Sequence, residues 1–205
     1  MKRLLCLSVA LPLLLPLLGV PAQEGKMPTS PYYPLQVGTT WHYKAGDNKF
    51  RMKVTRHENV GEVRCARVEL FIDDKSTASE LIAVTGDGVY RYAFDGKEAR
   101  PPVRFLKLPP KKGDAWKVDS EIGKDKEKLQ GTFKMGEEEV TVPAGKFKVV
   151  TSSAQDLDAN NLKLSVTYYF AEKVGMVKQV IVVDVTGTGK QTIVIELEKF
   201  EPAKP

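Results

Sequence analysis

From Thr39 onward, apolar and polar residues alternate along almost every segment of the chain, which is the period of a strand with one buried face. The clearest example runs from Leu162 to Phe170, where every second residue is large and apolar. The same period appears in further segments, marked by Trp41 and Tyr43; Val63 and Cys65; Val68, Leu70 and Ile72; Tyr90, Tyr92 and Phe94; Leu129, Phe133 and Met135; Ile181, Val183 and Val185; and Ile193, Ile195 and Leu197. The pattern predicts about a dozen strands.

Short turn signals separate these segments, at residues 45–48, 86–88, 95–96, 156–161 and 187–189. Their Gly, Asn and Asp residues tolerate the positive φ of tight hairpins. Two segments deviate. The apolar parity changes near Ala66–Arg67, which indicates a β-bulge or a strand that passes between two cores. The charged stretch Ser120–Leu129 has too few apolar positions for a helix, and we expect an exposed loop or short turn there.

No segment of twelve or more residues carries the apolar stripe of a helix, and there is no internal repeat. We therefore predict an all-β fold: a single strongly curved antiparallel sheet of about a dozen strands, arranged as an open barrel or a sandwich. Residues 38–202 form this one β domain. Residues 23–37 are rich in proline and polar residues, and we expect them to be an extended lead-in.

The N-terminus has the pattern of a secretory signal peptide. Lys2 and Arg3 precede the apolar run Leu4–Leu18, and small residues at Val20 and Ala22 fit a cleavage site after residue 22. A membrane anchor is the alternative, since the run is nearly long enough to span a bilayer, but two prolines interrupt it. Cys6 lies too early for lipid attachment. We expect an exported protein, periplasmic or extracellular, that does not span the membrane after cleavage.

The charge balance is close to even. The chain has 31 Lys and Arg against 26 Asp and Glu, a net charge of +5, and losing Lys2 and Arg3 with the signal peptide lowers it to +3. A slight basic excess on an exported domain does not indicate nucleic-acid binding. The 42% hydrophobic content excludes a disordered chain.

Candidate catalytic and metal-binding motifs are weak. His42 and His57 are the only histidines, and neither belongs to an H-x-x-x-H pair, so we expect surface histidines and no metal. Asp156–Asn160 begins like a calcium loop but lacks the later Gly and Glu, which favours a hairpin turn over weak surface calcium binding. Gly187–Lys190 lacks the other residues of a phosphate loop and reads as a glycine hairpin. No serine stands in a nucleophile elbow.

After cleavage Cys65 is the only cysteine, so an internal disulfide is excluded. We expect it to be a small buried apolar side chain rather than a reactive thiol. No cofactor motif is present.

Three segments resemble a group of uncharacterised exported bacterial all-β proteins. They are Tyr32–Leu35 followed by Gly38 and Trp41–Tyr43, then Val140–Phe147 with its V-P-A-G-K-F core, and Tyr168–Lys178 with its V-G-M-V-K end. In the last segment Glu172–Lys173 departs from the small residues usual in the group. The resemblance implies a fold and no activity or cofactor. A looser likeness, at the level of fold alone, is to the half-barrels of periplasmic lipoprotein carriers.

We therefore expect a non-enzymatic protein that binds an apolar ligand, a lipid or small molecule, on the concave face of its sheet. The candidate ligand-binding residues are the aromatic strand positions Trp41, Tyr43, Tyr90, Tyr92, Phe133 and Tyr168. Aromatics at this period also fill ordinary cores. The first alternative is an envelope protein-interaction or scaffold module acting through an edge strand or the lead-in. The second is a hydrolase, which would require two close carboxylates in a cleft or an acid beside His42.

Overall fold

The computed structural model describes residues 28–160, 162–185 and 189–204. They form twelve β-strands: Thr40–Ala45 (β1), Asn48–Val60 (β2), Val63–Ile72 (β3), Lys75–Val84 (β4), Gly88–Phe94 (β5), Lys97–Lys107 (β6), Ala115–Ile122 (β7), Glu127–Val142 (β8), Gly145–Ala159 (β9), Leu162–Ala171 (β10), Gly175–Val185 (β11) and Gly189–Glu201 (β12). The signal peptide and most of the 187–189 turn lie outside the described residues. The described part of the chain contains no helix that could span a bilayer.

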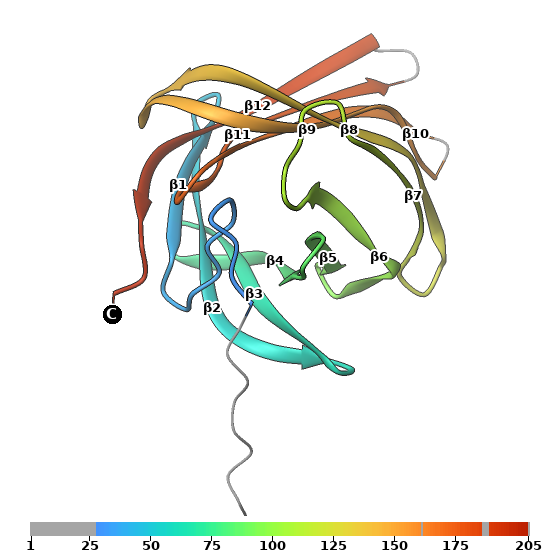
Figure 1. Cartoon of the computed structure of the whole chain (residues 1–205), viewed down its shortest axis with the longest axis horizontal. Helices are drawn as coiled ribbons and strands as arrows, with labels where there is room; N and C mark the ends of the chain where they lie inside the picture. Colours follow the sequence, from blue (N-terminus) through green and yellow to red (C-terminus); the bar gives the residue numbers. More distant parts are fainter. Residues whose placement is uncertain (1–27, 161, 186–188, 205) are drawn as a thin grey trace, which may run out of the picture.

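The strands form one antiparallel sheet that closes into a barrel. Each strand pairs with the next along the chain, and β1 pairs with β12. Figure 1 shows the ring, from β1 and β2 in blue round to β12 in red. The predicted all-β fold of about a dozen antiparallel strands is confirmed, but the sheet is a closed barrel rather than the open barrel or sandwich that we expected, because β1 pairs with β12.

Up-and-down order gives the barrel two distinct ends. Odd-numbered strands run away from residues 28–39, and even-numbered strands run back toward them. We call the end that carries residues 28–39 and the C-terminal residues 202–204 the lead-in end. The opposite end, which we call the far end, carries the described turns that follow odd-numbered strands.

The barrel closes weakly between β6 and β7. Only two residue pairs join these strands, Ala99 with Ile122 and Arg100 with Glu121. Pro101 and Pro102 follow directly and have no backbone N–H to donate. Two side chains replace the missing ladder: Trp116 Nε1 donates to the Arg104 carbonyl at 2.8 Å, and the Ser120 hydroxyl donates to the Pro101 carbonyl at 2.7 Å.

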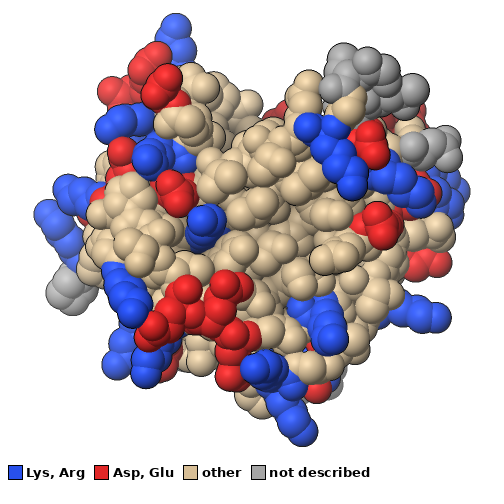
Figure 2. All heavy atoms as spheres, turned by 90° about the horizontal axis from the view of Figure 1, so that it is seen from above, with Lys and Arg blue, Asp and Glu red and all other residues tan. Residues whose placement is uncertain are grey.

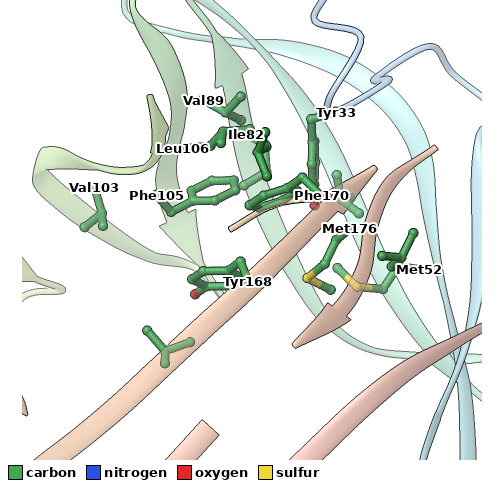
Figure 3. Close-up of a cluster of buried hydrophobic side chains, with 14 of the residues drawn as sticks. Tyr33, Met52, Ile82, Val89, Val103, Phe105, Leu106, Tyr168, Phe170 and Met176 are labelled. Carbon is green, nitrogen blue, oxygen red and sulfur yellow. The ribbon is translucent and has the colours of Figure 1, made fainter. Parts of the chain in front are cut away.

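Apolar side chains from every strand form the core inside the barrel. Figure 3 shows part of this core, where Tyr33, Phe105 and Phe170 meet in a group with Ile82 and Leu106 behind them. Ring centroids of Tyr33 lie 5.8 Å from Phe105 and 5.9 Å from Phe170, within the range of favourable aromatic pairs.

Two local predictions need correction. Ser120–Leu129 is not a loop: β7 extends to Ile122, β8 begins at Glu127, and only the turn between them is exposed loop. The strand β3 also keeps one parity, since Ala66, Val68 and Leu70 all face inward. The irregularity lies in the partner strand, where Thr55 is the extra residue between the pairs Val54–Val68 and Arg56–Arg67.

Other turns agree with the sequence. Pro143 and Ala144 join β8 to β9 in a two-residue turn, and Glu172–Val174 join β10 to β11 directly before Gly175. The sequence predicted a turn over residues 156–161, but most of this segment is strand. Asp156–Ala159 belong to β9, and Asp156, at φ 56°, marks a bulge opposite Ser165.

Candidate functional site: a cavity inside the barrel

The barrel encloses a cavity of about 380 Å³. Eight strands (β2–β6 and β10–β12) and the lead-in contribute to its wall. Its aliphatic and sulfur-containing lining comprises Met52, Leu70, Met176, Ile181 and Ile195. Its aromatic lining comprises Tyr33, Phe50, Phe94, Phe105 and Tyr168. Met52 and Met176 lie beside each other at one side of the cluster in Figure 3.

Three polar side chains interrupt this apolar wall: Glu80 on β4, Arg91 on β5 and Gln179 on β11. Arg91 Nη2 donates to both carboxylate oxygens of Glu80, each at 3.2 Å. The guanidinium carbon of Arg91 also lies 5.2 Å from the centre of the Phe105 ring, a cation–π distance. The two side chains are only 13% and 22% exposed, so the pair is largely withdrawn from solvent.

Its surroundings keep the Arg91 side chain charged. Desolvation by burial is the largest single influence on Arg91 and works against its charge, but the opposing influences, led by attraction to the Glu80 carboxylate, together outweigh it and raise the pKa of the guanidinium above its ordinary value. Tyr168 adds to the same effect. Burial, together with the negative charge of Glu80, raises the pKa of the nearby Tyr33 hydroxyl, which therefore stays protonated and able to donate.

Residues 28–37 close the lead-in end of the cavity. Tyr33 and Leu35 are 4% and 1% exposed, and the Tyr33 ring stacks on Trp41 at 5.7 Å. The His57 ring nitrogen Nε2 bonds to the Leu35 carbonyl at 2.7 Å, and the Lys173 amide donates to the Pro31 carbonyl. In Figure 1 this segment, in the darkest blue, lies within the ring of strands. The described part of the lead-in is thus a folded plug.

The far end carries exposed apolar side chains as well as charged turn residues. Phe94 lines the cavity and is also 49% exposed, so it marks the place where the cavity meets solvent. Five of the six exposed large hydrophobic side chains among the described residues belong to strand segments near this end: Ile72, Phe94, Leu162, Ile193 and Val194. An apolar molecule entering here meets exposed apolar side chains beside charged turns.

The residues predicted to bind ligand fall into three groups. Tyr168 lines the cavity. Trp41, Tyr43 and Phe133 are buried one layer behind the wall, and each contacts a lining ring, namely Tyr33, Phe50 and Tyr168 respectively. Tyr90 and Tyr92 alternate with the inward-facing Arg91 and therefore lie on the outer face, where the Tyr90 hydroxyl donates to Asp87 at 2.8 Å.

Sequence reasoning did not single out Glu80, Arg91 or Gln179. Their signal was present but easily overlooked: each is a polar residue at the inward parity of a strand whose neighbours at that parity are apolar. Arg91 stands two residues after the buried Val89, and Gln179 two residues before Ile181.

The other candidate sites, for metal binding and for hydrolysis, have less support in the described residues. Among the described residues, no three His, Cys, Asp or Glu side chains are grouped so as to hold a metal ion. His42 Nε2 lies 3.4 Å from Glu201 Oε1, which meets the condition set above for a hydrolase. Both residues are half-buried on the outer face of β1 and β12, and Lys199 also pairs with Glu201 at 2.6 Å. The shallow hollow beside His42 is lined by no Ser, Thr or Cys among the residues described.

Surface charge is mixed in sign. On the face seen in Figure 2, Lys and Arg groups stand next to Asp and Glu groups, and uncharged residues occupy much of the middle. The second large hollow, between the β5–β6 and β7–β8 turns, carries both signs as well, including Lys97, Glu98, Glu121 and Lys124.

No family model and no curated protein sequence matches the chain. Two solved structures are similar to it. One is a candidate lipoprotein from Parabacteroides distasonis, with 11% identity, a TM-score of 0.44, and coverage of 83% of this chain and 98% of that chain. The other is a candidate exported protein with a YmcC-like fold from Bacteroides fragilis, with 14% identity, a TM-score of 0.45 and the same coverage. At these scores the likeness supplies no functional argument, so function is argued from the cavity itself.

Proposed function

We propose that this protein is an exported, non-enzymatic binding protein that holds an apolar or amphiphilic small molecule inside its barrel. The observation that carries the proposal is the cavity of about 380 Å³ with a mainly apolar wall. Export is proposed from the signal-peptide pattern of residues 1–22.

The size of the cavity favours a binding site over a packing defect. Protein interiors are packed as densely as organic crystals, with few voids larger than a water molecule. An engineered core cavity that binds benzene measures roughly 150 Å³. The cavity here is more than twice that volume and falls within the usual range of ligand pockets, roughly 300–1,000 Å³.

Its volume also limits the ligand. If each non-hydrogen atom needs roughly the 30 Å³ that one water occupies in the liquid, the cavity holds on the order of a dozen such atoms. A single medium-length acyl chain or a small ring system fits this limit. A phospholipid with two acyl chains does not.

The two alternatives have less support. An interaction module acting through the lead-in would have to use a segment whose Tyr33 and Leu35 are packed inside the barrel. A hydrolase would have to use the half-buried His42–Glu201 pair, which lies away from the cavity and beside no Ser, Thr or Cys among the hollow-lining residues described.

Native mass spectrometry of the protein purified from cells that export it tests the proposal. The expected result is a population with an added small mass that is released by gentle collisional activation, and that an organic extract identifies as a lipid or other apolar compound. Repeated absence of any added mass, together with failure to bind added apolar probes, would overturn it.

A further inference from the structure

The polar groups of the cavity are gathered on one part of its wall. Glu80 and Arg91 face each other from neighbouring strands, and both Tyr33 and Tyr168 are close enough to influence the Arg91 or Glu80 charge. Gln179 lines the same cavity from β11. We call these five residues the polar cluster. Apolar pockets with a few placed polar groups are typical of sites that orient an amphiphilic ligand.

Hydrogen-bond donors outnumber free acceptors in this cluster. A guanidinium has five N–H donors, and the bonds to Glu80 involve only Nη2. Tyr33, Tyr168 and Gln179 each bring further donors. The two carboxylate oxygens are the strongest acceptors in the cluster, and both already accept from Arg91. A ligand head that accepts hydrogen bonds complements this arrangement.

The charge balance of the polar cluster determines which kind of hydrogen-bond-accepting head group the ligand can carry. Glu80 and Arg91 together are neutral, so an ionised head group would leave one net charge in a largely apolar cavity. Such a charge is expensive unless it is paired. A carboxylate would in addition lie close to the Glu80 carboxylate, and like charges at such a distance disfavour each other. An uncharged acceptor avoids both penalties.

Resting on the proposed function, we propose that the cavity binds a single-chain lipid whose head is an uncharged hydrogen-bond acceptor, such as an ester or amide carbonyl. The carbonyl accepts from the polar cluster, with Arg91 as its principal donor. The acyl chain lies against Met52, Met176 and Ile195. The volume limit derived above restricts the ligand to one chain.

Competition against a bound fluorescent probe small enough for the cavity, 1-aminonaphthalene, tests the head-group preference at neutral pH. The competitors are methyl decanoate, decanoate, decylamine and undecane, which share similar chains and differ in the head. We expect methyl decanoate to displace the probe at concentrations roughly tenfold below those of either ion and of undecane, which corresponds to about 1.4 kcal/mol.

Two variants assign that preference to the polar cluster. Exchanging Glu80→Met and Arg91→Met together removes both charges while keeping apolar bulk, and should abolish the advantage of the ester over undecane. Tyr168→Phe keeps the ring packed against Phe133 and Phe170, removes one donor, and should weaken ester binding by roughly threefold. It serves as the test if the double variant does not fold.

The outcomes separate the two proposals. Tighter binding of decanoate or decylamine than of the ester, or an ester advantage that persists in both variants, would overturn the head-group assignment while leaving the apolar site intact. If the probe and all four competitors fail to bind the wild-type protein, the proposed function itself fails.

Discussion

Glu80 and Arg91 form an ion pair inside an otherwise apolar barrel, with Arg91 Nη2 at 3.2 Å from each carboxylate oxygen. The two residues occupy neighbouring strands, and neither is more than 22% exposed. A buried pair of this kind contributes little net stability compared with apolar residues of similar volume, because desolvation offsets most of the attraction. Its presence is therefore better explained by ligand orientation than by stability.

The first prediction compares the loss of one partner of the Glu80–Arg91 ion pair with the loss of both. Glu80→Met alone should lower the free energy of unfolding by about 3–5 kcal/mol, because it leaves the Arg91 charge unpaired in the cavity wall. Exchanging both residues for Met should leave stability within about 1–2 kcal/mol of wild type. Urea unfolding followed by tryptophan fluorescence measures both. Equal losses in the single and double variants would contradict this account of the pair.

The second prediction concerns Gly175, at the point where the lead-in meets β11. Its φ is +95°, and a Cβ there would lie 3.2 Å from Trp41 Nε1 and 3.3 Å from Pro34 Cδ. Gly38 has nearly the same φ, +98°, with no atom within 4 Å of the added carbon. Gly38→Ala should cost about 1–2 kcal/mol for backbone strain alone. Gly175→Ala should cost about 2–4 kcal/mol, since crowding is added. Thermal or urea unfolding compares them, and equal losses would show that the plug yields freely at Pro34 and Trp41.

The third prediction tests the plug. Tyr33→Ala removes a ring that contacts Trp41, Phe105 and Phe170, and should destabilise the protein by about 3–5 kcal/mol. Tyr32→Ala, at the half-buried neighbouring position, is the matched control and should cost clearly less. Urea unfolding gives both values. Similar losses at the two positions would mean that the described lead-in is not anchored through Tyr33.

The fourth prediction concerns pH. Burial, assisted by the charge of Glu58, raises the pKa of the Cys65 thiol from 9.0 to about 11. Between these values the unfolded chain loses the thiol proton and the folded protein keeps it, so this contribution to stability is complete below pH 9 and is lost as pH rises toward 11. Wild-type stability should therefore fall across that window by up to roughly 2–3 kcal/mol more than that of Cys65→Ala. The raised pKa would be contradicted if urea unfolding showed the same loss of stability between pH 9 and pH 11 for both proteins.

The alternation of apolar and polar residues predicted the strands and much of the core, because the pleat of a β-strand places successive side chains on opposite faces. Trp41, Tyr43, Phe133 and Tyr168 all have the buried parity that the sequence indicated. Parity does not reveal which face is inside when both carry large residues. On β5 the aromatic Tyr90 and Tyr92 alternate with Val89 and Arg91, and it is the latter pair that faces inward.

The pairing of Glu80 with Arg91 could not be predicted from the sequence, for a related reason. Glu80 and Arg91 meet only because β4 and β5 pair in one register, and irregularities lie in that register at Leu81–Ile82 and, toward β6, at Arg91–Ala93. The second irregularity also turns Phe94 into the cavity. A one-residue shift exchanges the two faces of a strand, so such pairs follow from pairing geometry and not from local pattern.

The central claim, that the interior of the barrel is a binding site, is tested most directly by titrating 1-aminonaphthalene into three proteins. Ile195→Trp places a larger side chain into the cavity wall. Val194→Trp places the same side chain at the next position on β12, which faces outward and is 36% exposed. Urea unfolding first confirms that both variants are folded.

We predict that wild type and Val194→Trp bind the probe with closely similar Kd, and that Ile195→Trp binds it about tenfold more weakly or worse, a difference of about 1.4 kcal/mol. Binding by folded Ile195→Trp with the wild-type Kd would place the probe outside the cavity and contradict the claim.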